Sequence, residues 1–333
     1  MISRRSLIIR AFRGYGYSCL KPLSTIIILT VFICFYGNMP LLAGTTCKGD
    51  YIEWFNNDVG NLAYIMQNNK EVNGLFRFVI RVKLRKEIET LENKIALILD
   101  NPAYTHPTLG FYIYDPDAAG WLHALYKARN ARKHLLSSHL EDFPPENKNI
   151  NILSDGTPLF EAGPDMVPEI EEVVKTIEGM SLPPVVFRGY KIFILPFSMG
   201  EISGLGSKGY MLLGAPPHDH ENIRNQVAFT VAHEIGHHIH MTFIGSIYED
   251  NPQLWDEYME IRGIPKWTTD GNVNSEAWFE STEETFAEDV RVIFGSGEAA
   301  LWPHCTKYPD PRIDSEITEA LRSFICKCIG VCC

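Results

Sequence analysis

Apolar residues recur at spacings of three and four along several stretches of the chain, a pattern typical of helices with one buried face. In residues 76–99 the apolar positions, separated by Lys, Arg and Glu, are Leu84, Ile88, Leu91, Ile95 and Ile98. Similar patterns predict helices over residues 118–139, 167–180, 221–243, 252–261, 283–294 and 315–326. Residues 51–139 are therefore expected to be mainly helical.

Short apolar runs rich in β-branched and aromatic residues predict a few strands. These runs are residues 109–114, 149–153, 190–195 and 210–213, and a glycine-rich turn over 200–209 precedes the last one. Because helices come first and a small sheet followed by helices comes afterwards, the order of elements predicts an α+β fold. Prolines crowd residues 141–168 and favour a boundary there. We expect a helical segment over residues 45–140 and a second domain over 141–333.

The first 44 residues have the order of a cleavable export signal. Five basic residues and no acidic ones precede the 12-residue apolar run 25–36, and small residues follow at Ala43 and Gly44. This order predicts cleavage near residue 44 and a secreted protein. The alternative is an uncleaved membrane anchor, which needs about 20 apolar residues. The run reaches 19 residues only by including Asn38 and Pro40, so a membrane contact is expected only if the leader is retained.

The charge of the chain excludes one class of partner. The net charge is −11 over 333 residues, and it becomes −16 without residues 1–44. Proteins that bind nucleic acid present a basic face to the phosphates, so we expect no nucleic acid partner. No pattern in the sequence specifies an oligomeric state.

The cysteines fit an exported protein. Two of the eight lie in the leader, and the other six are Cys47, Cys305, Cys326, Cys328, Cys332 and Cys333. An even number of cysteines in a secreted chain predicts disulfides, although six cysteines allow 15 pairings. The dense tail Cys326–Cys333 leaves a second metal site open as an alternative, and lipidation of the terminal pair would require a cytosolic protein.

Residues 232–238 read Ala-His-Glu-Ile-Gly-His-His within a predicted helix. Helical positions four apart lie on one face, so His233 and His237 can bind the same ion, and zinc is the expected metal. Glu234 lies beside them and is expected to act as the general base on a zinc-bound water molecule. The apolar residues around this sequence indicate a buried helix.

A catalytic zinc site needs a third protein ligand and an open fourth position. Ser281 followed three residues later by Glu284 is a capping-box pattern, so a helix is predicted to begin there. Glu284 and Glu288 would share one face of that helix. We expect Glu284 to be the third ligand, with Glu283 as the nearest competitor, and Glu288 to support a ligating histidine.

These two segments resemble a known family. His233-Glu-Ile-Gly-His237, followed 47 residues after His237 by Glu284-Thr-Phe-Ala-Glu288, is similar to the anthrax lethal factor-like zinc metallopeptidases, which include secreted Pro-Pro endopeptidases. The resemblance covers residues 185–295, where the runs 190–196 and 204–214 are similar to the sheet ahead of the active-site helix. It implies a zincin-like catalytic domain, with Glu284 as zinc ligand and Glu288 as its support. It also makes a preference for proline worth testing.

One position departs from the family pattern. The family usually has a tyrosine seven residues before the ligating glutamate, where its hydroxyl stabilises the oxyanion, and this chain has Ala277. Loss of such a donor lowers the rate by about 100- to 1000-fold in other hydrolases. A histidine or a loop tyrosine is the expected substitute.

Three further expectations concern residues near the site. The strand Gly209–Gly214 is a candidate sheet edge, with which an extended peptide could pair. His218 and His220 are expected to be capping and turn residues. His238 and His240 are expected to be structural or to face solvent.

The leading hypothesis is therefore a secreted zinc endopeptidase that acts on a protein or peptide substrate. One alternative is a catalytically silent secreted protein that keeps its zinc, for which Ala277 is the main support. The other is a metal-binding surface protein that works through the cysteine tail 326–333.

Overall fold

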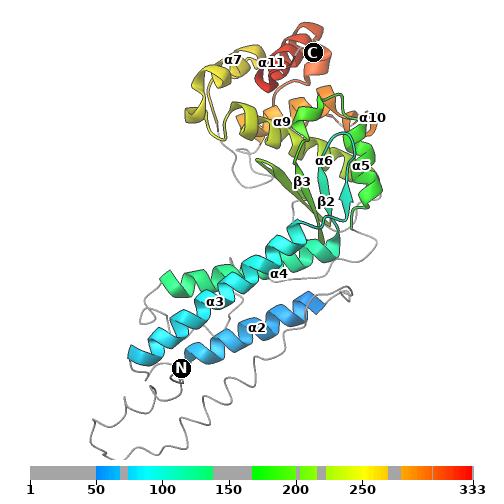
Figure 1. Ribbon diagram of the computed structural model, residues 1–333. Helices are drawn as coiled ribbons and strands as arrows, with labels where there is room; N and C mark the ends of the chain where they lie inside the picture. The colour runs from blue at the N-terminus through cyan, green and yellow to red at the C-terminus, as the bar shows by residue number, and fades with distance from the viewer. Residues whose placement is uncertain are drawn as a thin grey trace, which may run out of the picture. The chain divides into compact units, whose positions relative to one another are not determined.

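The computed structural model describes residues 50–67, 74–137, 167–199, 203–215, 223–268, 279–301 and 303–331 (Figure 1). Several expectations lie outside these residues: the export signal, the strand 149–153, and the positions Cys47, His218, His220, Ala277, Cys332 and Cys333. Within the described ranges, no helix combines the length and the apolar character that a membrane span requires.

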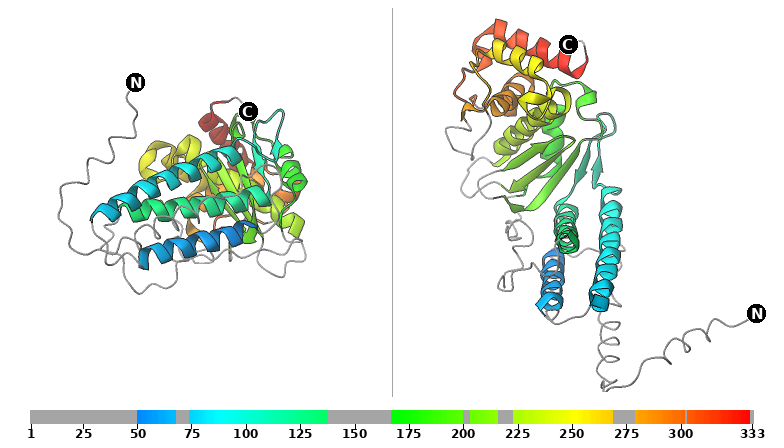
Figure 2. Two further views of the ribbon diagram at one scale, coloured as in Figure 1. Left: turned by 60° about the horizontal axis from the view of Figure 1, so that its bottom comes forward. Right: turned by 90° about the vertical axis from the view of Figure 1, so that its left-hand side faces the viewer.

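Three helices form the first part of the described chain, namely α2 (Asp50–Gln67), α3 (Gly74–Leu99) and α4 (Pro116–Ser137). Both α2 and α3 pack against α4, and the left view of Figure 2 shows the three side by side. The predicted helix 76–99 is confirmed as α3. Its apolar positions Leu84, Ile88, Leu91 and Ile95 are buried, as the spacing predicts.

A buried ionic cluster links these three helices. Arg132 of α4 donates to both carboxylate oxygens of Asp58 on α2, at 2.7 and 2.6 Å, and to Glu87 on α3 at 2.9 Å. We call Asp58, Glu87 and Arg132 the helical cluster. Because its bonds run between three helices, it fixes their relative positions.

A mixed five-stranded sheet has the order β1-β2-β3-β5-β4. Its strands are β1 (Tyr104–Thr105), β2 (Tyr112–Tyr114), β3 (Lys191–Ser198), β4 (Gly204–Ser207) and β5 (Tyr210–Ala215). The pairs β2–β3 and β3–β5 are parallel, and the two outer pairs are antiparallel. β2 falls within the strand predicted over residues 109–114. Since β1 and β2 come from residues 45–140 and the other strands from 141–333, the two segments share one sheet.

The edge next to β5 differs from the expectation. The prediction that Gly209–Gly214 lies at the sheet edge is wrong, because β4 pairs with β5 and is the outer strand among those described. β4 lies within the predicted glycine-rich turn 200–209. Gly209, with a φ of +83° that favours glycine, lets the chain turn back directly from β4 into β5.

The remaining helices pack on the sheet and on one another. They are α5 (Ile170–Glu178), α6 (Ile223–Ile239), α7 (Pro252–Arg262), α9 (Thr282–Phe294), α10 (Gly297–Ala300) and α11 (Ser315–Ile329). Short turns complete them: 3-10 turns at Pro184–Val186, Tyr248–Asp250 and Pro311–Ile313, and a π turn at His240–Ile244. Helix α6 contacts β4, β5, α5, α9 and α10, so it lies at the centre of the largest apolar core. The fold is α+β, as expected.

The described cysteines are in two states. Cys326 on α11 is in a disulfide whose partner lies outside the described residues. Cys305 and Cys328 are free thiols. At least one cysteine of the tail is therefore disulfide-bonded.

Candidate metal centre

Two helices in direct contact, α6 and α9, form the centre, and they approach each other closely at Gly236 of α6. A Cβ atom on Gly236 would lie 2.5 Å from the Cα of Ala287 on α9, a distance that side chains do not tolerate. Glycine and alanine at this crossing therefore allow the helix backbones to meet. The contact places the predicted residues of α6, His233, Glu234 and His237, against α9.

The start of α9 directs Glu284 toward these histidines. Ser281 is the N-cap, and its hydroxyl accepts from the backbone N–H of Glu284 at 3.3 Å. The predicted cap is confirmed, but the Glu284 side chain points to the metal centre: its Oε2 lies 3.0 Å from His233 Nε2 and 3.4 Å from His237 Nε2. Glu283, the competitor, is half-buried and outside this group.

The three donor atoms have the separations that a metal ion requires. The two Nε2 atoms of His233 and His237 lie 3.1 Å apart, which completes a triangle with Glu284 of sides between 3.0 and 3.4 Å. Ligands at about 2.1 Å from a tetrahedral ion lie about 3.4 Å from one another. The centre formed by His233, His237 and Glu284 could therefore hold a metal ion.

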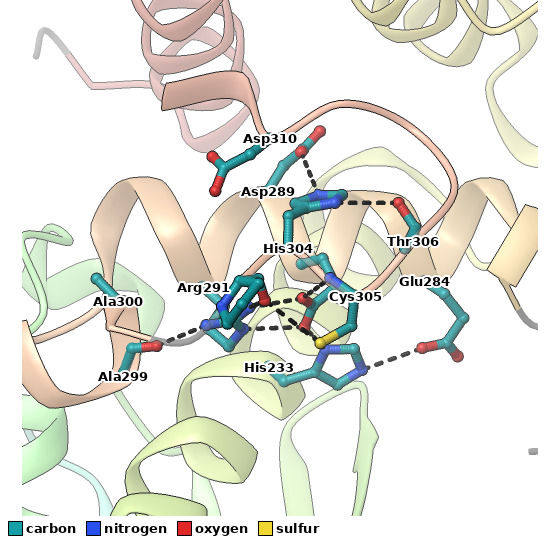
Figure 3. A network of polar contacts seen from close by, with 12 residues as sticks. His233, Glu284, Asp289, Arg291, Ala299, Ala300, His304, Cys305, Thr306 and Asp310 are labelled. Atoms are coloured by element: carbon teal, nitrogen blue, oxygen red, sulfur yellow. Dashed lines mark hydrogen bonds and ion pairs between the residues drawn. The ribbon is translucent and has the colours of Figure 1, made fainter. Parts of the chain in front are cut away.

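Glu288 binds the other nitrogen of His233. His233 Nδ1 donates to Glu288 Oε1 at 2.8 Å, and this leaves Nε2 to face the centre. Arg291 donates to both oxygens of Glu288, at 2.9 and 2.7 Å, and the backbone N–H of Cys305 donates at 2.9 Å. We call His233, Glu288 and Arg291 the site cluster; Figure 3 labels its His233 and Arg291. The carboxylate is thus held from three sides.

Backbone carbonyls hold Arg291 in turn. Its guanidinium donates to the carbonyl oxygens of Ala299 at 2.6 Å and Pro303 at 2.8 Å, and its side chain is fully buried. Sequence reasoning missed Arg291 and Cys305, because only the folded chain brings residues 299–305 back to α9.

The electrostatics of the centre favour a cation. Burial opposes the charged form of His233, but hydrogen bonds to Glu284 and Glu288 raise its pKa well above the ordinary value. Burial likewise opposes ionisation of Glu284, but the neighbouring His237 and His233 hold the pKa of its carboxyl well below the usual range. Groups that stabilise a positive charge on an imidazole also stabilise a bound metal ion.

Glu234 lies against the backbone of β4. The N–H of Gly206 donates to its Oε2, and a Cβ on Gly204 or Gly206 would lie 2.6 or 2.8 Å from its carboxylate oxygens. The two glycines therefore make room for this carboxylate. Burial raises the pKa of Glu234 above its ordinary value.

Of the two expected alternatives for His238 and His240, structural or facing solvent, the structure agrees with the first, because both are buried. His238 lies 2.9 Å from the carbonyl of Val186 and accepts from the N–H of Gly209 at 3.0 Å. His240 is fully buried and lies 3.1 Å from His237. Burial, with the nearby His237, lowers the pKa of His240 to about 3.

The far side of α9 is anchored by Asp289, which sequence reasoning also missed. Tyr258 donates to Asp289 at 2.7 Å, Arg262 pairs with it at 2.8 Å, and His304 lies at 2.9 Å. Figure 3 shows His304 and Asp289 on the opposite side of α9 from Glu284. These contacts fix the helix that presents Glu284.

Comparisons of the chain with protein-family models, with curated proteins and with solved structures gave no match.

Proposed function

We propose that the protein is a zinc-dependent endopeptidase with a zincin-like catalytic domain, in which His233, His237 and Glu284 bind zinc and Glu234 is the general base and acid. The supporting observation is the convergence of two imidazole nitrogens and one carboxylate within 3.4 Å, with a second buried carboxylate next to them in the chain. The proposal includes secretion, as the leader predicts.

The donor set fits zinc better than the common alternatives. Calcium and magnesium prefer sites made only of oxygen, whereas two imidazoles and one carboxylate with an open fourth position form a typical catalytic zinc site. When bound, zinc supplies a Lewis acid that activates water and polarises a carbonyl group.

Glu234 has the properties that proton transfer requires. Burial raises the pKa of its carboxyl above the ordinary value, which makes Glu234 a stronger base than an exposed carboxylate. Its bond from Gly206 N–H orients the carboxylate. In the proposed mechanism Glu234 takes a proton from the attacking water and delivers it to the leaving amine.

The substrate position follows from the sheet. β4 is the outer strand of those described, and it contacts the helix that bears Glu234. An extended peptide that pairs with β4 would gain main-chain hydrogen bonds and would pass next to Glu234. We therefore propose a protein or peptide substrate bound in extended form.

Digestion of a peptide library by the zinc-loaded protein, read by mass spectrometry, tests the proposal. Glu234→Gln should abolish cleavage and keep zinc binding, because the ligands remain. Glu319→Gln changes an exposed glutamate on α11 and should cleave like the wild type. Cleavage that persists in Glu234→Gln would refute the assigned mechanism. Stoichiometric zinc without any cleavage would instead favour a silent zinc-binding protein.

A further inference from the structure

His240 lies one turn beyond His237, where α6 changes into the π turn. Its ring is fully buried and contacts the rings of Trp255 and Phe286, with centroids at 5.6 and 5.9 Å. Its Nδ1 faces the carbonyl oxygen of Gly245 at 3.3 Å, and its Nε2 faces His237 Nδ1 at 3.1 Å. Each ring nitrogen of His240 is therefore directed at one polar atom.

The chemistry of these atoms decides where the hydrogens lie. A carbonyl oxygen can only accept, so His240 Nδ1 must be the donor to Gly245. Burial among apolar rings disfavours a charged imidazole, so the other nitrogen of His240 has only a lone pair and must accept. The hydrogen in that second bond belongs to His237 Nδ1. His237 then has its lone pair on Nε2, the atom that faces Glu284 and His233.

We propose that His240 is a positioning residue that holds His237 in the tautomer whose Nε2 lone pair is available to a metal ion. The chain of bonds runs from the carbonyl of Gly245 through His240 to His237. The identity of the ion rests on the proposed function, but the tautomer is a property of the metal-free protein.

Gly245 closes the turn that makes this contact possible. Its backbone N–H donates to the carbonyl oxygen of His240 at 2.7 Å, while its own carbonyl faces the His240 ring. Its φ of +151° favours glycine, and a Cβ there would lie 2.5 Å from the Cβ of Asp250. The turn therefore holds His240 by its backbone and by its side chain.

The two ligating histidines are thus supported by different chemistry. His233 donates to the carboxylate of Glu288, which makes its imidazole more basic. His237 donates to a neutral imidazole, which sets the tautomer without adding a charge to the buried centre. This role needs only a side chain that accepts a hydrogen bond from His237 Nδ1. His240→Gln should therefore keep the function of the histidine, and His240→Leu should lose it.

The tautomer is read directly from nitrogen–proton correlation spectra of the metal-free, histidine-labelled protein. The His237 signals are identified by their loss in His237→Gln. In the wild type and in His240→Gln we expect the hydrogen of His237 on Nδ1, and in His240→Leu we expect a shift toward Nε2. A wild-type His237 with its hydrogen on Nε2 would overturn the proposal, whether or not the leucine variant folds.

Zinc affinity, measured by competition with a chromophoric chelator, gives the second result. Loss of such a partner weakens metal binding by about 10- to 100-fold, which we expect for His240→Leu, with His240→Gln remaining within about threefold of the wild type. His106→Leu, which removes another buried histidine that bonds to Glu178, is the matched control and should have no effect.

The outcomes separate this proposal from the proposed function. Equal zinc affinity of His240→Leu and the wild type would overturn the role of His240 even in an active peptidase. The expected spectra and affinities in a protein that cleaves no peptide would support the role of His240 and reject only the peptidase.

Discussion

Arg132 and Arg291, two of the buried arginines in the described part of the chain, bind carboxylates with different consequences. In the helical cluster, Arg132 binds the carboxylates of Asp58 and Glu87, so its ionic bonds stay within the cluster. In the site cluster, Arg291 binds Glu288, which also accepts from His233. The second chain of bonds continues through the imidazole ring to an Nε2 atom that faces the other two donor atoms of the candidate metal centre.

The comparison shows that a buried ion pair does not by itself indicate a functional site. Buried ion pairs are expensive to desolvate and often serve to connect elements, as the helical cluster does. What distinguishes the site cluster is that its last atom, His233 Nε2, converges with His237 Nε2 and Glu284 Oε2. This convergence, which the helical cluster lacks, marks the candidate place for a cation.

The largest expected effect is the loss of stability on replacing Arg132 or Arg291. Arg132→Met leaves Asp58 buried without its partner and should lower the free energy of unfolding by about 3–5 kcal/mol, with no change in the zinc affinity of the folded protein. Arg291→Met should cause a similar loss and weaken zinc binding as well, because Glu288 loses its main donor. Urea unfolding and chelator competition measure the two quantities. A change of zinc affinity in folded Arg132→Met would break the distinction between the clusters.

A substitution where α6 crosses α9 should have the next largest effect on stability and zinc affinity. Gly236→Ala places a methyl group against the backbone of Ala287, and overpacking of this kind costs about 1–3 kcal/mol. Separation of the helices should also move Glu284 away from His237 and weaken zinc binding. Thermal unfolding with and without zinc measures both effects. A variant with wild-type stability and affinity would show that the helices adjust without moving the donors.

The carboxylates of the two clusters should also differ in their effect on zinc affinity. Glu288→Gln keeps an acceptor for His233 but removes its charge, so zinc affinity should fall by about 10-fold. Glu87→Gln makes the same change in the helical cluster and should leave zinc affinity unaltered. Parallel chelator titrations of the two variants test this. Equal losses of zinc affinity in both variants would mean that the total negative charge of the protein, and not the bond from Glu288 to His233, controls zinc affinity.

The smallest expected effect is a gain in stability, not a loss. Gly60 lies within α2, and a Cβ there would meet no atom within 4 Å. Because glycine is a poor helix former, Gly60→Ala should raise the free energy of unfolding by about 0.5–1 kcal/mol. Chemical denaturation measures the gain, and a loss of stability would indicate a contact at this position beyond the described residues.

Much of the candidate centre could be predicted because local rules determine it. The spacing of four in α6 puts His233 and His237 on one face, and the cap at Ser281 starts α9 so that Glu284 and Glu288 share a face. These relations depend on helix geometry alone. The pairing of the two helices was expected only because an unfinished metal site needs a third ligand.

The rest depends on contacts that the local pattern does not contain. The pattern of residues predicts a turn over 200–209 because Gly204 and Gly206 lack strand-forming side chains, yet this absence is what lets β4 lie against Glu234. His240 was not recognised because its role requires the π turn after α6. Arg291 was missed because its partners at Ala299 and Pro303 come from a later loop.

The order of the metal donors along the chain has a consequence for biogenesis. His233 and His237 leave the ribosome first, and Glu284 follows on a helix that is held by Asp289, Arg291 and segments further downstream. A nascent chain that ends before α9 can therefore offer only two of these three donors to a passing ion, and the full donor set exists only after α9 and residues 299–305 have folded back onto α6. Tight metal binding would then follow the packing of α9 rather than guide it.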